Sequence, residues 1–287
     1  MTERLADIGA RISGVHQLDA VVNAMRGIAA VRVQQARRQI VAVDSYTTTI
    51  TAAMGRIVAG VPPGPDGSRL TGGKLALVVF CAEQGFAGAF SEHIFDAISA
   101  DLEKAELFLI GTRGHSVASE RAITPAWTSA LPAHSPAIPK LANTICNTLY
   151  ERINAGVLDR LEVVFSTWET SGARVVRRRL FPIDHSQITP MGDAQPPVTN
   201  LPAPLLLETL GADYVHALLC NAALHSFVAE NEARIAAMAQ ARGQIESQLA
   251  ELTARERHIR QEAITAEIIE LATGELASRD DKRRRPD

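Results

Sequence analysis

The segment VVFCAEQGFAGAFSEH, residues 78–93, has the residue types and the order from which phosphate-binding loops are built. An apolar run leads into a turn that contains Gly85 and Gly88, and a helical pattern follows. Such a unit can hold a phosphate on the free backbone N–H groups at the start of the helix. The glycines lack the GxGxxG spacing, and we expect Glu83 to repel an anion there. The segment favours a tightly packed turn, with a nucleotide-binding α/β enzyme as an alternative.

The other residues that could do chemistry have no spacing that brings them together. None of the eight histidines forms an HxxxH or HExxH pattern, and GTRGHS, residues 111–116, places a serine beside a histidine without a nucleophile elbow. Cys81, Cys146 and Cys220 are too far apart in sequence to indicate a zinc site or a disulfide framework. We therefore expect no catalytic, cofactor-binding or metal-binding residues on this chain.

Composition and charge exclude two classes of partner. The 29 Lys and Arg residues are spread along the chain and are outnumbered by 32 Asp and Glu residues, so nucleic acid is not an expected partner. No apolar stretch of about 18 residues occurs, so we expect no direct insertion into a membrane. A membrane association would then depend on a partner protein.

The middle of the chain, residues 70–200, has the short periods of an α/β domain. KLALVVF and ELFLIG are apolar runs of strand length, and SEHIFDAISADLEKA between them is typical of a helix with Ser91 as its N-cap. These three segments predict a parallel βαβ unit. KLANTICNTLYERINAG predicts a further helix, and RLEVVFSTWET with ARVVRRRLFPI predicts a strand pair joined by SGA. The fold class expected here is a Rossmann-like α/β domain, followed by a Pro- and Gly-rich linker at 189–204.

The first 60 residues have the pattern of one long helix. No proline occurs between Glu3 and Val58, and apolar residues recur at steps of three or four in a narrow stripe. VPPGPDGS, residues 61–68, ends the pattern. The predicted stripe consists of Ile8, Ile12, Val15, Leu18, Val22, Met25, Ala29, Val33, Ala36, Ile40 and Val43.

A second long helix is predicted for residues 205–277, before a charged tail at 278–287. Roughly 70 helical residues span on the order of 100 Å, whereas a domain of about 130 residues has a radius of gyration of only about 14 Å. Each terminal helix must therefore bury its stripe against the other, which predicts a long antiparallel coiled coil with the α/β domain inserted. The second stripe consists of Ile235, Met238, Ile245, Leu249, Leu252, Ile259, Ala263 and Ala266.

Periodicity alone is equally typical of a coiled-coil adaptor or scaffold protein, so the motifs on the two helices matter. RHIRQEAITAEIIELATG near the end contains R-Q-x-A-I-T-x-E-I-x-E, and RISGVHQLDAVVNAMRGIAAVR near the start contains R-I-x-x-V, then A-M, then A-A and a base. The pair, together with NEARIAAMAQA and the inserted α/β domain, resembles the gamma subunit of F-type ATP synthases over nearly the whole chain.

The resemblance implies a mechanical and non-catalytic role. The two terminal helices would form the central rotor shaft inside a ring of three alpha and three beta subunits, and the chemistry would belong to the beta subunits. The α/β domain would bind the epsilon subunit near the membrane c-ring. The complex would couple ion transport to ATP synthesis or hydrolysis, with this chain as a peripheral subunit at the cytoplasmic face of the cell membrane.

The resemblance also assigns residues that contact the beta subunit. Arg260, Gln261, Thr265 and Glu267 match polar positions that meet a beta-subunit loop, and Met25 matches a position near the same contact. Cysteines introduced near residues 25 and 260 are accordingly expected to crosslink.

The chain departs from the usual family pattern on the first helix. Ala20 and Asn23 stand where lysines are common, and Leu18 stands where threonine is common. These departures predict a thinner track of positive charge along the shaft and a divergent, second-operon version of the subunit.

Overall fold

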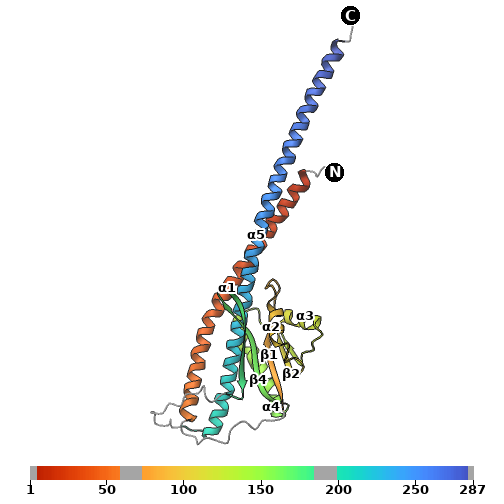
Figure 1. Cartoon of the computed structure of the whole chain (residues 1–287). Helices are drawn as coiled ribbons and strands as arrows, with labels where there is room; N and C mark the ends of the chain where they lie inside the picture. Colours follow the sequence, from red (N-terminus) through yellow and green to blue (C-terminus); the bar gives the residue numbers. More distant parts are fainter. Residues whose placement is uncertain (1–4, 59–72, 184–198, 284–287) are drawn as a thin grey trace. The chain divides into compact units, whose positions relative to one another are not determined.

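In the computed structural model, the described residues are 5–58, 73–183 and 199–283, with side chains up to residue 274. Two helices account for just over half of the described residues: α1 spans Leu5–Val58 and α5 spans Ala203–Arg283 (Figure 1). The chain divides into two compact units, one of residues 27–237 and one that combines 1–26 with 238–287. The predicted helix terminator at 61–68 and most of the predicted linker lie outside the described residues.

A five-stranded mixed sheet forms the centre of the 27–237 unit, in the order β3-β2-β1-β4-β5. The parallel βαβ prediction is confirmed, because β1 pairs in parallel with β2. The predicted strand pair is also confirmed, since β4 and β5 are antiparallel neighbours. The strands are β1 (Lys74–Phe80), β2 (Ala105–Ile110), β3 (Trp127–Ser129), β4 (Leu158–Glu169) and β5 (Gly172–Phe181).

Helices cover both faces of this sheet, which explains why β1 is an uninterrupted apolar run rather than an alternating one. Val78 and Phe80 belong to a core cluster shared with α4 (Ile138–Asn154), α1 and α5. Leu77 and Val79 belong to a second cluster, formed with α2 (Phe90–Ile98) and α3 (Thr112–Glu120). The predicted helix around residue 145 is α4, and a short 3-10 turn (Ser135–Ala137) precedes it.

The predicted N-cap role of Ser91 is wrong. The α2 helix begins one residue earlier, at Phe90, and its N-cap residue Ala89 makes no side-chain capping bond. Ser91 is buried inside the first turn, where its hydroxyl oxygen accepts a hydrogen bond from the backbone N–H of Ala82 at 3.2 Å. The serine therefore ties the helix to the end of β1 instead of satisfying the helix's own N–H groups.

Within the 27–237 unit, α1 and α5 pack against each other in opposite directions. Arg37 contacts Glu232 at 2.7 Å, and further along α1 the side chain of Asp44 accepts a hydrogen bond from Asn221 at 2.6 Å. As numbers rise on α1 they fall on α5, which is the antiparallel arrangement. The predicted stripe residues Ala29, Val33 and Ala36 are buried here.

The unit of residues 1–26 and 238–287 is held by a small apolar cluster. Val22, Met238 and Ile245 are buried together, with Val15, Met25, Ala241 and Leu249 packed around them, and Arg242 donates a hydrogen bond to Asn23 at 3.4 Å. Leu18 is a correction to the predicted stripe, because it is 51% exposed. Ala263 and Ala266 are a second correction: every described side chain after Ile259 is exposed.

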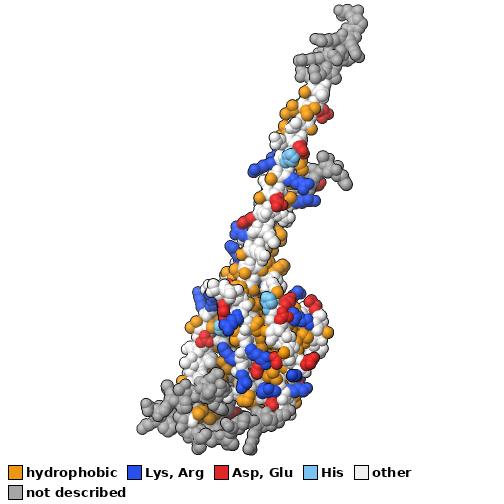
Figure 2. All heavy atoms as spheres, viewed as in Figure 1, with side chains coloured by type: hydrophobic (Ala, Val, Ile, Leu, Met, Phe, Trp, Pro, Cys, Tyr) orange, Lys and Arg blue, Asp and Glu red, His pale blue; other side chains and the backbone are white. Residues whose placement is uncertain are grey.

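Among the described residues, the end of α5 after Ile259 is a single exposed helix without a paired neighbour (Figure 1). Its exposed side chains include large apolar ones, visible along this end of the helix in Figure 2. We expected the apolar residues to be internal, and these are not. They are Ile264, Ile268, Ile269 and Leu271.

We predict that Gly114→Ala destabilises the sheet unit. A Cβ atom at Gly114 would lie 2.3 Å from Cβ of Cys81, which is buried in the cluster under α3. Overpacking of this kind costs about 1–3 kcal/mol. Thermal melting of the full chain measures the effect, with Gly85→Ala as the control because no atom lies within 4 Å of its added Cβ. Equal melting temperatures for the two variants would contradict the packing described here.

Candidate functional site

The four polar residues singled out near the end of the chain lie on adjacent turns of α5 and are all exposed. Successive residues are rotated by about 100°, so Arg260 and Glu267 share one side of the helix and Gln261 and Thr265 share the next. Arg260 pairs with Glu256 at 2.7 Å, and the Thr265 hydroxyl donates to the Gln261 carbonyl at 2.8 Å. Their remaining polar surface is available to a partner.

Met25 does not lie near these four residues. It packs beside Val22, Met238 and Ile245, whereas Arg260 lies roughly 30 Å further along α5 at 1.5 Å per residue. The expected crosslink between positions 25 and 260 is therefore wrong. The antiparallel pairing places Met25 opposite the neighbourhood of Ala241 instead. Met25 is half-buried, so it serves the packing of the two helices and still presents part of its side chain.

The exposed end of α5 combines polar and apolar contacts on one side. At helical spacing, Ile264 and Leu271 fall on the same side as Arg260 and Glu267. Both apolar side chains are more than half exposed. A surface of this composition, on a helix that has no neighbour among the described residues, is suited to contact with other protein chains.

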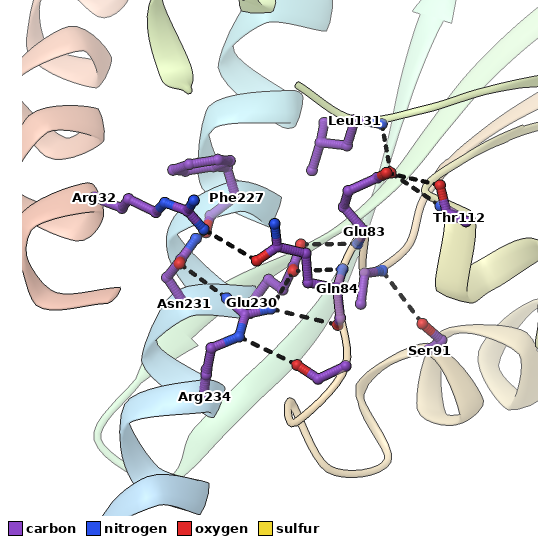
Figure 3. A network of polar contacts seen from close by, with 12 residues as sticks. Arg32, Glu83, Gln84, Ser91, Thr112, Leu131, Phe227, Glu230, Asn231 and Arg234 are labelled. Carbon is purple, nitrogen blue, oxygen red and sulfur yellow. Dashed lines mark hydrogen bonds and ion pairs between the residues drawn. The ribbon is translucent and has the colours of Figure 1, made fainter. Parts of the chain in front are cut away.

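A second constellation, which the sequence analysis missed, lies where α5 meets the end of β1 (Figure 3). Its centre is an ion pair between Glu230 and Arg234, 2.5 Å apart, with side chains only 3% and 5% exposed. Charged side chains are almost never buried to this degree unless they are paired. Glu230 and Arg234 are the first and last residues of ENEAR, residues 230–234, one helical turn apart in an apolar part of α5. Two opposite charges at this spacing within an apolar segment were the signal available in the sequence.

The ion pair holds the loop after β1 through hydrogen bonds to both the N–H groups and the carbonyl groups of its backbone. The Glu230 carboxylate accepts hydrogen bonds from the N–H groups of Glu83 and Gln84, each at 3.1 Å. Arg234 donates to the carbonyls of Gly85 at 3.2 Å and Gln84 at 3.4 Å. A further bond from Arg234 to the Asn231 amide oxygen, at 2.9 Å, orients the guanidinium. We call these five residues, Glu83, Gln84, Glu230, Asn231 and Arg234, the polar joint.

Glu83 does not guard the start of α2, where we expected it to repel an anion. Its carboxylate accepts hydrogen bonds from the N–H and hydroxyl of Thr112, at 3.0 and 2.7 Å, and from the N–H of Leu131 at 2.8 Å (Figure 3). Thr112 is the first residue of α3, so Glu83 caps that helix from a distant part of the chain. A negative charge at a helix N-terminus is also favoured by the helix dipole.

The turn after β1 is consequently held by the protein's own groups. Gly88 adopts φ of 62°, a conformation that glycine reaches without strain. The carbonyls of Gln84 and Gly85 are directed to Arg234. The positive φ accounts for Gly88 as part of a tight turn.

Among the described residues, no group of three or more His, Cys, Asp or Glu side chains is arranged to hold a metal ion. Burial raises the pKa of the thiols of Cys81, Cys146 and Cys220 to about 12. None of the described helices is both long and apolar enough to cross a membrane.

Comparison with known proteins gives consistent matches along the chain. A family model described as ATP synthase matches residues 4–277. The ATP synthase gamma chain of Streptomyces avermitilis is 25% identical over 296 aligned positions, covering 94% of each chain. That of Beutenbergia cavernae is 27% identical over 285 positions, covering 92% of this chain and 94% of its own.

Solved structures share the fold. A chain in the mitochondrial ATP synthase of Euglena gracilis, from a structure of its OSCP, F1 and c-ring, matches with a TM-score of 0.68 and 15% identity. The match covers 99% of this chain and 97% of that one. A chain in the rotor structure from the same organism matches with a TM-score of 0.63 at 14% identity, covering 91% and 98%.

We predict that Glu83→Ala loosens α3. The substitution leaves the N–H groups of Thr112 and Leu131 without their charged acceptor, and losing hydrogen bonds to a charged group costs roughly 1.5–3 kcal/mol. Amide hydrogen exchange of the full chain should speed up at Thr112 and Leu131. Glu103→Ala, at an exposed position, is the control. Unchanged exchange at both amides would show that Glu83 is not the cap.

Proposed function

Since the chain belongs to the ATP synthase gamma-subunit family, we propose that it is the central rotor shaft of an F-type ATP synthase. The shaft consists of α1 and α5, and the complex couples ion flow through a membrane c-ring to ATP synthesis or hydrolysis on the beta subunits. Active sites belong to those subunits, and this chain changes their affinities by its orientation.

One structural observation supports the proposal: residues 15–25 of α1 pack against residues 238–249 of α5, and α5 continues beyond this pairing as an exposed helix. A shaft has to be stiff and asymmetric, so that each turn presents a different side to each surrounding subunit. An apolar seam inside the pair supplies stiffness. The single helix supplies the asymmetry.

The end of α5 is the proposed contact with the surrounding ring of three alpha and three beta subunits. Arg260, Gln261, Thr265 and Glu267 offer hydrogen bonds and charge to a beta-subunit loop. The exposed apolar residues beside them, such as Ile264 and Leu271, would be removed from water there. Met25 is proposed to contribute to the contact with the beta subunits at the level of Ala241, roughly 30 Å along α5 from Arg260.

The α/β domain is proposed to bind the epsilon subunit and to lie near the c-ring. The complex would place this chain at the cytoplasmic face of the cell membrane as a peripheral subunit. The charged tail after residue 277 is proposed to project from the ring, because charged side chains are costly to bury without partners.

Native mass spectrometry of the complex purified from membranes tests this function. We expect one copy of this chain with three alpha and three beta subunits, because a single shaft fills the axis of the ring. A coiled-coil adaptor would instead be recovered as a self-associated species or with helical partners, and that outcome would contradict the proposal.

The double substitution Arg260→Ala and Gln261→Ala tests the contact. We expect coupled ATP turnover to fall several-fold, by loss of hydrogen bonds worth about 1–2 kcal/mol, while nucleotide binding to the beta subunits is retained. ATP hydrolysis and ion pumping by the assembled complex are the measurements. Arg257→Ala with His258→Ala removes two side chains from the preceding exposed turn and is the control. Full turnover in the first variant would exclude these residues from the contact.

A further inference from the structure

We propose that the polar joint carries torque, fixing the sheet to α5 so that the two rotate as one body. The inference rests on the proposed function, since torque passes through this chain only if it is a shaft. All residues of the joint belong to the 27–237 unit. The proposal assigns a positioning role to Glu230 and Arg234, which have no contact with a reacting group.

The first reason is the direction in which the joint's bonds resist movement. Apolar side chains that pack against one another resist separation, but the hydrophobic effect itself is not directional. Hydrogen bonds weaken steeply when their angles change. Glu230 and Arg234 together form hydrogen bonds to N–H groups and carbonyls of residues 83–85. Rotation of α5 against that loop would therefore break several of these bonds together.

The second reason is burial. The charges of Glu230 and Arg234 are almost completely excluded from water, so displacing one partner would leave an uncompensated buried charge. The neighbouring ion pair between Arg37 and Glu232 differs in this respect, because its side chains are 52% and 18% exposed. Water can replace the partner there at little cost.

The third reason is that the joint reaches several elements of the domain. Glu83 extends it to the start of α3 and to Leu131 after β3. Ser226 adds a buried hydrogen bond from α5 to the carbonyl of Phe80 at the end of β1, at 3.0 Å. Arg32 of α1 donates to the Gln84 side chain at 3.1 Å (Figure 3). A force applied to the sheet would thus reach both long helices at one level.

Two variants remove the joint to different degrees. Glu230→Gln with Arg234→Met eliminates both buried charges and keeps similar volumes, a change that proteins often tolerate. Arg234→Lys keeps the charge but loses the planar fork that reaches Glu230, Asn231 and the loop carbonyls together. Glu232→Gln is the matched control, since it removes a carboxylate two residues away that does not contact the loop.

The measurement is the torsional stiffness of single assembled complexes. A bead is attached through Ser171→Cys, an exposed position in the turn between β4 and β5, while the alpha and beta subunits are fixed to a surface. The three natural cysteines are buried, so thiol reagents favour the introduced one. Angular fluctuation of the bead without ATP reports stiffness, because the variance is inversely proportional to it.

We expect the variance to at least double in Glu230→Gln/Arg234→Met, to rise by less in Arg234→Lys, and to stay unchanged in Glu232→Gln. A variant that melts at a lower temperature but has unchanged variance would overturn the proposal, because the joint would then only stabilise the fold. If the double variant does not assemble, Arg234→Lys decides by the same criterion. Failure of the parent complex to rotate on addition of ATP would instead contradict the proposed function.

Discussion

The packing of the first helix on the last is the interaction on which the rest of the structure depends. Each helix carries a narrow stripe of apolar side chains, and burial of such a stripe supplies most of a helix's stability in a folded protein. Val22 of the first helix and Met238 and Ile245 of the last are buried against one another. The sheet is inserted in sequence between the two helices, and the polar joint attaches it to α5.

Polar contacts select one register for the pairing of α1 with α5. Apolar contacts alone would allow several registers. Alanines and valines at helical spacing can slide by one turn with modest loss. The hydrogen bond from the buried Asn221 to Asp44, and the buried contacts of Glu230 and Arg234 with the loop after β1, fix one register. The molecule thus uses apolar residues for the strength of its association and a few buried polar residues for its geometry.

Much of the architecture was predictable, and the failures have physical causes. The strands and long helices were predictable from periodicity. A buried face requires apolar residues at the repeat of the helix or strand that carries it. The α3 helix, TRGHSVASE, was missed because its start is capped by Glu83, which is 29 residues away in sequence. The stripe on α5 was extended too far because periodicity records which side could be buried, and Ala263 has no described partner to bury it. The contact residues proposed on α5 came from family resemblance, since exposed polar side chains carry no periodic signal.

The order in which the chain is made has a consequence for its biogenesis. Val22 leaves the ribosome early, whereas its partner Met238 is synthesised more than two hundred residues later. At about 5–20 residues per second, the first helix must wait on the order of ten to forty seconds with its apolar stripe uncovered. A nascent chain of this design is a natural client for chaperones that shield amphipathic helices until the carboxyl terminus arrives.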